Sequence, residues 1–328
     1  MVYDLLTFGE AMIRLAPPQH CRLEQTGLLE VEVGGSELNA AVAAQRMGLK
    51  TAFVTKLTRN PLGHLIENKA REHGVDMTHA VWTDDHRIGL YFVEFGSAPR
   101  PNSVLYDRRN SAIACSVADD FDWDRILPKG KVFHTSGITP ALSPSMAEVT
   151  LDAVKRAKKA GLLVSVDLNY RERLWSREQA RRVMREILEI ADVLFTTEED
   201  TERVFGIAAA SYDEVARMVA EQFKLRVVAI TLRGTQSVKR NTWSAITYCG
   251  NELYSAPTYE IEVVDRVGSG DSFAGGFLYG YLTGGAELGL RCGVAVSALK
   301  QTSHGDFCWT TREEVERVMN QQSLRIVR

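Results

Sequence analysis

The feature that most constrains the fold is an alternation of apolar and amphipathic segments through the middle of the chain. Apolar runs as long as a buried strand are separated by segments in which apolar residues recur every three or four positions, as on one helix face. The strand-like runs are 131–135, 162–167, 193–196 and 227–231, and the helical segments between them are 143–160, 176–190 and 212–223. Strands linked through helices pair in parallel by right-handed crossovers, and helices cover both faces of the sheet. The alternation therefore predicts an α/β fold with a mostly parallel central sheet.

The N-terminal part of the chain shows the same pattern with two short additions. Gly34-Gly35-Ser36 opens a helix that runs through Met47, and Gly48 supplies its C-terminal stop. Strands are expected at 3–8 and 51–57, a helix at 61–73, and short extended runs at 12–15 and 28–33.

The segment between residues 88 and 106 departs from the alternation. Two strand-like runs, 88–95 and 103–106, follow each other with only the turn 96–102 between them. The first run is apolar on both faces, and such a small sheet must be covered on both sides. One face can close over a substrate while the other packs on a second subunit. A peripheral hairpin packed on its own domain fits the pattern equally well.

Length and composition narrow the class of protein. The 328 residues fit one large α/β domain with a small appendage or two medium domains. A formal net charge of −3 gives no footprint for nucleic acid or an anionic membrane. Five cysteines without a C-x-x-C pair argue against a zinc site and for a reducing compartment. Without a signal peptide or a membrane-spanning run, the sequence predicts a cytoplasmic protein.

The segment with the strongest chemical signal is Gly268-Ser269-Gly270-Asp271. A strand-like run at 259–264 ends shortly before it, and a helix rich in small residues begins at about Asp271. Glycines at the start of a helix let backbone N–H groups converge, and the helix dipole adds positive potential. Such a turn binds a phosphate and stabilises the charge on a transferring phosphoryl group.

Asp271 has two interpretations at this stage. A carboxylate in the first turn of a helix is commonly a cap. Beside a bound phosphate, however, a second anion is repelled unless it has a function, and the obvious one is to accept the proton of an attacking hydroxyl.

Other nucleotide and metal motifs are missing from the sequence. There is no Gly-x-x-x-x-Gly-Lys-Ser/Thr segment, so the chain is not a P-loop protein. The first strand leads into Gly9-Glu10-Ala11 rather than a dinucleotide fingerprint, which argues against a dehydrogenase. The seven histidines show no metal-ligand spacing.

Two distant segments together resemble the signatures of the ribokinase-like (PfkB) sugar kinases. Gly268–Asp271 is similar to the C-terminal signature, and Gly34-Gly35-Ser36-Glu37-Leu38-Asn39-Ala40 is similar to the N-terminal one. The resemblance extends from Asp4 to about Asp306. It implies one kinase domain over 1–328, a three-layer α/β/α fold, and a small β-lid from about 11–33 and 86–110. It also implies Mg-ATP as donor, Asp271 as base, and Gly268, Ser269 and Gly270 as the anion hole.

Within that family the chain looks most like 2-keto-3-deoxygluconate (KDG) kinases. The segments that carry this likeness are 100–108 and 167–175. The implied substrate contacts are Gly34, Asn39, Tyr91, Tyr106, Arg108, Arg171 and Asp271. Tyr106 and Arg108 lie two apart on an extended strand and so share a face. Arginines suit a sugar acid, because guanidinium pairs with carboxylate. Surface ion pairs, or a contact of Arg171 with ATP phosphate, are the alternative roles.

The nucleotide side follows from the same resemblance. The implied nucleotide contacts are Asn169, Thr231, Arg233, Gly234, Gly268, Gly270 and Lys300. Backbone oxygens near Asp265 and Ser303 are implied ligands of a monovalent cation such as K⁺. Thr197 and Asp200 stand where the family commonly has Asn and Glu, so Asp200 is expected to hold Mg²⁺ through water. Arg266-Val267 departs from the threonines of many relatives.

The sequence thus predicts phosphorylation of the 6-hydroxyl of KDG by ATP. A kinase for a neutral sugar such as fructose or ribose is the alternative within the enzyme class. A catalytically silent sugar sensor on the same fold is the alternative outside it, supported by Thr197. The two-faced lid strand further predicts a homodimer or higher homo-oligomer through the lid.

Overall fold

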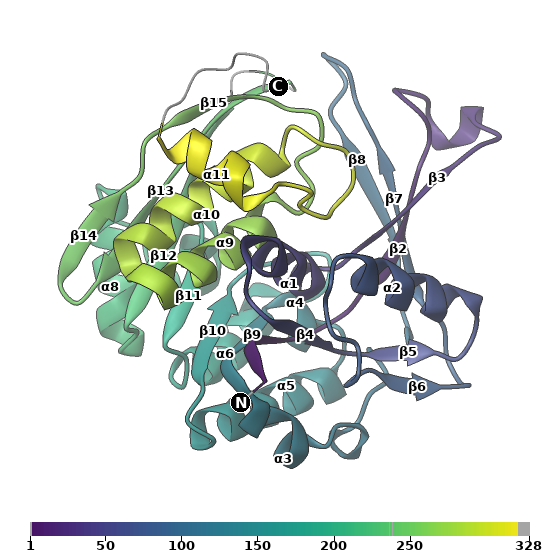
Figure 1. Ribbon diagram of the computed structural model, residues 1–328, viewed down its shortest axis with the longest axis horizontal. Coiled ribbons are helices and arrows are strands. Elements are labelled where there is room, and N and C mark those ends of the chain that lie inside the picture. The colour runs from purple at the N-terminus through teal and green to yellow at the C-terminus, as the bar shows by residue number, and fades with distance from the viewer. Residues whose placement is uncertain (1, 236, 238, 321–328) are drawn as a thin grey trace.

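The computed structural model describes residues 2–235, 237 and 239–320, and within them a nine-stranded sheet forms the centre of the molecule (Figure 1). Its strands lie in the order β14 (Glu252–Ser255), β13 (Arg240–Cys249), β12 (Val227–Thr235), β11 (Val193–Thr196), β10 (Leu163–Asp167), β9 (Gly130–Ser136), β1 (Tyr3–Phe8) and β4 (Thr51–Val54), and β15 (Tyr259–Glu262) pairs with β13. Pairing is parallel from β12 to β4 and antiparallel around β13. The predicted, mostly parallel sheet is confirmed.

Helices cover both faces of this sheet. One face packs against α5 (Pro144–Lys159), α6 (Arg177–Leu188) and α8 (Tyr212–Phe223), and the other against α1 (Ser36–Met47), α9 (Ser269–Gly284) and α10 (Ala286–Lys300). Neighbouring residues of one strand serve opposite layers: Leu194 belongs to the first core and Val193 to the second. Strands buried on both faces explain the continuous apolar runs in the sequence. The three-layer α/β/α class is confirmed.

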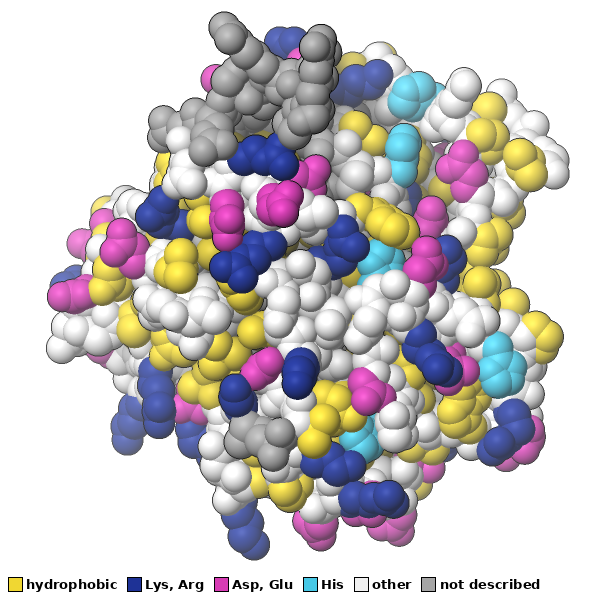
Figure 2. All heavy atoms as spheres, in the orientation of Figure 1, with side chains coloured by type: hydrophobic (Ala, Val, Ile, Leu, Met, Phe, Trp, Pro, Cys, Tyr) yellow, Lys and Arg dark blue, Asp and Glu magenta, His cyan; other side chains and the backbone are white. Residues whose placement is uncertain are grey.

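Further elements lie around this framework. They are α2 (Pro61–Glu72), α3 (Trp123–Ile126), α4 (Ile138–Ala141), α7 (Glu198–Phe205), α11 (Arg312–Met319) and the strand pair β5 (Lys56–Thr58) and β6 (Val81–Thr83). None of the helices in the described part of the chain has the length and apolar character that crossing a bilayer requires. On the face drawn in Figure 2, acidic and basic side chains are interspersed, so no extended field of one sign covers it.

A second, four-stranded sheet projects from one side of the molecule (Figure 1). We call it the lid; its order is β3 (Glu30–Gly34), β2 (Met12–Ala16), β7 (Gly89–Glu94) and β8 (Ser103–Asp107). The strand register places Arg14, Tyr91 and Tyr106 side by side on one face. The opposite face carries a row of apolar residues, which are Val31, Leu15, Phe92 and Leu105.

Two predicted strands differ from those observed. The run 51–57 was expected to form one strand, but it divides at Thr55 into β4 of the central sheet and β5, which pairs with β6. A continuous apolar run does not show that the chain changes sheets. The strand expected at 227–231 continues to Thr235, because β13 pairs antiparallel along its whole length. The extension, Leu232-Arg233-Gly234-Thr235, has no alternation of apolar and polar residues and contains a glycine, so it carries little strand signal of its own.

Candidate active site

A cavity of about 520 Å³ lies between the lid and the carboxyl ends of the parallel strands. Open α/β sheets bind ligands at this edge. Several elements contribute to the wall: the ends of β10, β11 and β12, the first turns of α1 and α9, and the inner face of the lid. Predicted site residues on this wall are Asn39, Tyr91, Tyr106, Arg108, Asn169, Arg171, Asp200, Thr231, Arg233, Gly268, Ser269, Gly270 and Asp271.

The glycine-rich turn begins α9 at Ser269, two residues before the start expected from the sequence. Gly268 has φ +83°, and a Cβ there would lie 2.2 Å from the backbone oxygen of Asp306. Only glycine meets both conditions without strain. The first N–H groups of a helix have no partner within it, so such a turn can bind an anion. One of them, the Ser269 N–H, donates to the Arg266 backbone oxygen at 3.2 Å.

Asp271 lies in the first turn of α9 but does not cap it. Its Oδ1 accepts a hydrogen bond from Ser36 Oγ (2.7 Å) and its Oδ2 accepts one from Asn39 Nδ2 (2.7 Å). No side-chain oxygen caps this helix, whose N-cap residue is Gly268. Residues of the N-terminal signature thus hold the carboxylate at the cavity wall. Burial raises the pKa of Asp271, and the two hydrogen bonds oppose that change.

Two further carboxylates line the cavity near Asp271. Burial, with the charges of Asp271 and Asp200, raises the pKa of Asp167 well above its usual range. Burial also raises the pKa of Asp200, against the opposing charge of Arg171. Crowded carboxylates facing a cavity favour a cation, and they are typical of functional sites.

The raised pKa of Asp271 predicts the pH dependence of turnover. A carboxylate base works only when ionised, so kcat/KM should fall on acidification at a pH above the ordinary range of an aspartate. The check is kcat/KM measured against pH down to the limit of folding, with circular dichroism as the control for unfolding. An acidic limb within the ordinary range of aspartate contradicts the prediction.

The structure separates the two arginines expected to meet a substrate carboxylate. Arg108 Nε donates to Glu10 Oε2 at 2.7 Å in a buried ion pair, and its guanidinium lies 5.5 Å from the Tyr106 ring. Its charge is therefore already compensated, contrary to the expectation of an open cation. Arg171 is exposed on the cavity wall and forms no ion pair with any described residue. Of these two arginines, Arg171 is therefore the one whose guanidinium is open to a ligand carboxylate.

The lid residues on the cavity wall are tied to a carboxylate that the sequence did not predict as part of the site. The hydroxyl of Tyr91 donates to Asp306 Oδ2, and the Tyr91 and Tyr106 rings stack with centroids 5.9 Å apart. A Cβ on Gly34 would lie 2.1 Å from Asp306 Oδ2, so glycine allows that carboxylate to approach. Gly34 itself is not on the cavity wall. The structure therefore gives no support to Gly34 as a sugar contact. It indicates instead that glycine is needed there so that Asp306 can pack against the backbone.

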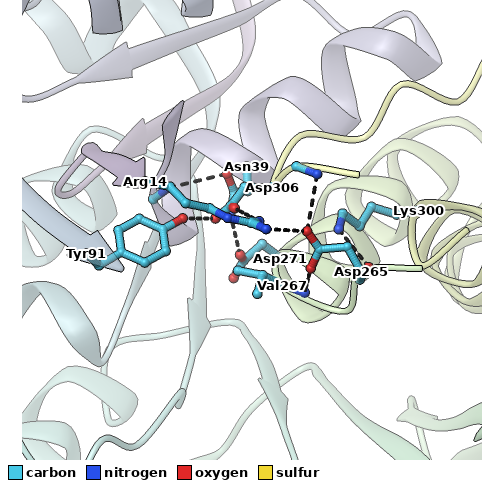
Figure 3. A network of polar contacts seen from close by, with 10 residues as sticks. Arg14, Asn39, Tyr91, Asp265, Val267, Asp271, Lys300 and Asp306 are labelled. Atoms are coloured by element: carbon cyan, nitrogen blue, oxygen red, sulfur yellow. Dashed lines mark hydrogen bonds and ion pairs between the residues drawn. The ribbon is translucent and has the colours of Figure 1, made fainter. Parts of the chain in front are cut away.

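Asp306 and Asp265 share one arginine of the lid (Figure 3). Arg14 Nη1 lies 2.7 Å from Asp306 Oδ1 and its Nη2 lies 2.7 Å from Asp265 Oδ2, with all three side chains at least 97% buried. Asp265 Oδ1 also accepts the Val267 N–H at 3.0 Å. This arrangement, the Arg14 clamp, joins lid strand β2 to the loops on both sides of α9 and α10.

Two predicted nucleotide contacts do not reach the cavity. Lys300 is fully buried, and its Nζ donates to the backbone oxygen of Asp265 at 2.9 Å. Gly234 lies in β12, where a Cβ would meet Thr242 Oγ1 at 2.3 Å. The motif match placed both in the correct segments, but it did not show in which direction those segments face. Asn169 does face the cavity and donates from Nδ2 to Ser36 Oγ (3.1 Å).

Thr197, which departs from the family pattern, has a local structural role. Thr197 is the N-cap of α7, and its Oγ1 accepts the Asp200 N–H at 3.1 Å. Threonine thus positions the helix that carries Asp200. Within the described residues, no three His, Cys, Asp or Glu side chains form a metal cage. A cation such as Mg²⁺, which keeps several waters and binds substrate phosphates, needs no such cage.

Sequence reasoning missed several residues of this site. They are Glu10, Arg14, Ser36, Glu37, Asp167 and Asp306. Glu10 and Asp167 stand at the carboxyl ends of β1 and β10, a position that could have singled them out. Glu37 is buried, and its Oε1 accepts hydrogen bonds from Ser136 and Thr139. No sequence signal indicates the pairing of Arg14 with residues more than 250 positions away.

Comparison with known proteins agrees with this geometry over almost the whole chain. The sequence profile of the pfkB family carbohydrate kinases matches residues 3–311. The 2-dehydro-3-deoxygalactonokinase of Haloferax volcanii is 39% identical over 320 residues, which cover 97% of each chain. The crystal structure of a 2-dehydro-3-deoxygluconokinase from Thermotoga maritima is 41% identical, with a TM-score of 0.94 over 98% of this chain and 99% of that one. The 5-dehydro-2-deoxygluconokinase of Shouchella clausii is 30% identical over 326 residues, covering 98% of this chain and 96% of that protein. This chain therefore belongs to the pfkB family of carbohydrate kinases, and it is a phosphotransferase that uses an alcohol group as acceptor.

Proposed function

We propose that this kinase phosphorylates the 6-hydroxyl of 2-keto-3-deoxygluconate (2-dehydro-3-deoxygluconate), with ATP as donor and Asp271 as general base. The observation that carries the proposal is the Asp271 carboxylate, held by Ser36 and Asn39 beside the glycine turn. The hydroxyl proton passes to Asp271 as its oxygen attacks the γ-phosphorus, and the bond from that phosphorus to the ADP oxygen breaks. The turn of Gly268, Ser269 and Gly270 would stabilise the charge on the transferred group through the N–H groups at the start of α9.

ATP, the phosphoryl donor, would bind in the part of the cavity lined by β12. Thr231 and Arg233, in the second half of β12, would bind the nucleotide. Mg²⁺ would neutralise phosphate charge, and Asp200 with Asp167 would hold it through water. The raised pKa of both carboxylates fits this role, because a bound cation relieves their repulsion. The cytoplasm is the proposed location, because all five cysteines are free thiols.

A sugar acid is favoured because Arg171 is exposed on the cavity wall and forms no direct ion pair with a described residue, while the carboxylates of Asp167, Asp200 and Asp271 interact with its charge only at longer range. A substrate carboxylate would give that guanidinium a direct ion pair, and a neutral sugar would not. The names of the relatives, a galactono- and a glucono-type 3-deoxy kinase, point to the same substrate class and differ in stereochemistry. A fructokinase- or ribokinase-like activity and a silent sensor are the competing functions. The ordered Asp271 carboxylate speaks against the sensor, which has no use for a base.

The deciding experiment is ADP release with Mg-ATP over a panel of acceptors. The panel contains KDG, its galactose-derived epimer, fructose, ribose, gluconate and adenosine. Turnover on a keto-deoxy acid with little on neutral sugars supports the proposal, and the ratio of the two epimers gives the stereochemistry. Turnover on fructose or ribose overturns the sugar-acid assignment. Ligand-induced thermal shifts without turnover on any acceptor indicate the sensor.

Replacement of Arg171 tests the carboxylate contact. Arg171→Gln should raise KM for the keto-deoxy acid about 10- to 100-fold, since a hydrogen bond to a charged group is lost. KM for ATP should change much less. Arg177→Gln, an exposed arginine at the start of α6, is the matched control. An equal rise in KM for both substrates assigns Arg171 to the phosphates instead.

The outer face of the lid is the proposed subunit contact. Val31 is 50% exposed and Leu105 58% exposed, and the Leu15 and Phe92 side chains lie between them in the same row. Apolar rows of this kind mark interaction surfaces. We propose that 1–328 forms one kinase domain whose lid pairs with that of a second copy. Leu105→Asp should lower the mass measured by light scattering to that of a monomer. A wild-type chain that is monomeric at all concentrations contradicts the proposal.

A further inference from the structure

Lys300 ends α10 with its side chain turned into the protein. It is 0% exposed, and its ammonium donates to the Asp265 backbone oxygen at 2.9 Å (Figure 3). Burial removes the hydration of a charged group, so a lysine persists in the interior only where neighbouring groups compensate its charge. Methionine would fill the same space without that penalty. A buried lysine at this position therefore suggests that the positive charge itself has a function.

The surroundings of Lys300 supply the compensation. Burial lowers the pKa of Lys300, while the carboxylates of Asp265 and Asp306 favour its charged form and Arg14 opposes it. Two cations and two carboxylates thus form one buried set. The ammonium is the second cation that these carboxylates balance, beside the guanidinium of the Arg14 clamp.

Asp265, which Lys300 contacts, is held at each of its polar atoms. Its Oδ1 accepts the Val267 N–H (3.0 Å), and its Oδ2 accepts the Gly305 N–H (3.2 Å) and pairs with Arg14 (2.7 Å). Its backbone N–H donates to the Gln301 oxygen (3.2 Å), and its backbone oxygen accepts from Lys300 (2.9 Å). Asp265 precedes Gly268 by three residues. Fixing Asp265 therefore fixes where the anion-binding turn begins.

The family resemblance implies a K⁺ ion among the backbone oxygens near Asp265 and Ser303, and the Asp265 oxygen lies in that group. K⁺ and an ammonium group both present a single positive charge to carbonyl oxygens. Because the Asp265 oxygen already faces a buried ammonium, a second cation against it would be repelled. The site therefore does not fit K⁺. We propose that Lys300 is a built-in monovalent cation, a positioning residue that holds the turn so that the kinase needs no added K⁺. This inference rests on the kinase activity and not on the identity of the sugar.

The first test uses the wild-type enzyme. ADP release is measured with tetramethylammonium as the sole monovalent cation and then with K⁺ added at constant ionic strength. ADP should be quantified directly, because a coupling enzyme can bring its own cation requirement. We expect equal rates in both conditions. A severalfold stimulation by K⁺ overturns the proposal, because it requires a separate cation site.

The second test removes the ammonium. Lys300→Ala leaves a space beside Asp265, and kcat should fall about 10- to 100-fold in tetramethylammonium, as for a misplaced reacting group. K⁺ or ammonium ion should restore part of that loss and raise the thermal midpoint of this variant, but not of the wild type. Lys300→Met, which fills the space with an apolar group, should lose activity without rescue.

Lys159→Ala is the matched control, because Lys159 also ends a helix but is exposed to solvent. It should respond to neither cation. A Lys300→Ala enzyme with unchanged kcat, or one that loses activity equally in all cations, contradicts the proposal. If the Lys300 variants do not fold, the wild-type cation titration still decides it.

Discussion

Replacing Asp271 by asparagine is expected to lower kcat about 10²- to 10⁴-fold, the range for loss of a general base. Asparagine keeps the shape and can still accept from Asn39, but it cannot take up the hydroxyl proton. Substrate binding, followed by calorimetry, should be largely retained. The fold should not suffer: the raised pKa of Asp271 means that its ionised form destabilises the native state near neutral pH. The thermal midpoint of Asp271→Asn should therefore equal or exceed that of the wild type.

Glu287→Gln is the control for this variant. Glu287 also lies in the first turn of a helix, α10, but is exposed. It should leave kcat unchanged. An Asp271→Asn enzyme that keeps more than a tenth of the wild-type turnover would remove Asp271 from the role of base and leave it a structural residue that orients Ser36 and Asn39.

Removing the Arg14 clamp is expected to cause the largest loss of stability. Arg14→Met leaves two buried carboxylates, Asp265 and Asp306, without their shared guanidinium. Breaking a buried ion pair from one side typically costs about 3–5 kcal/mol, because the remaining charge stays uncompensated. The measurement is the free energy of unfolding in urea. Arg14→Lys should be intermediate, since an ammonium lacks the fork that spans two carboxylates.

Arg87→Met provides the comparison within the same lid. Arg87 also pairs with an aspartate, Asp107, but both side chains are open to water, at 39% and 53% exposure. Water and salt screen such a pair, so its loss should shift unfolding far less. Equal effects of Arg14→Met and Arg87→Met would show that the Arg14 clamp does not secure the lid.

The sequence predicted the central part of the fold and the turn around Asp271 because both depend on local patterns. Strands β1 and β11 and helix α8 lie at the residues expected, since apolar periodicity marks an element wherever it packs. The glycines at 268 and 270 meet a local backbone requirement, so the turn is recognisable without the rest of the chain.

The sequence could not show which charged side chains pair with each other inside the protein. Arg108 has the residue type of an open carboxylate ligand, yet Glu10, 98 positions earlier, already pairs with it. Lys300 has the residue type of a nucleotide contact, yet its helix turns it inward onto Asp265. Only tertiary packing decides which of several arginines and lysines remain open to a ligand. The sequence assigned Arg171 to the substrate and Lys300 to the nucleotide; in the structure Arg171 lines the cavity and Lys300 does not.

The contacts that close the site join residues far apart in the sequence, and this affects how the chain folds during synthesis. Arg14 and Asp306 lie 292 positions apart, and Ser36 and Asp271 lie 235 apart. All four lid strands lie within the first 107 residues. They are therefore synthesised long before Asp265 and Asp306, the carboxylates that secure the lid. Until Asp265 and Asp306 have been synthesised, Arg14 has no carboxylate partner and the lid is not secured to the rest of the protein. A partly folded chain of this kind, with its apolar lid face exposed, is prone to association. A nascent chain arrested before Asp306 should therefore depend on chaperones until its last turns emerge.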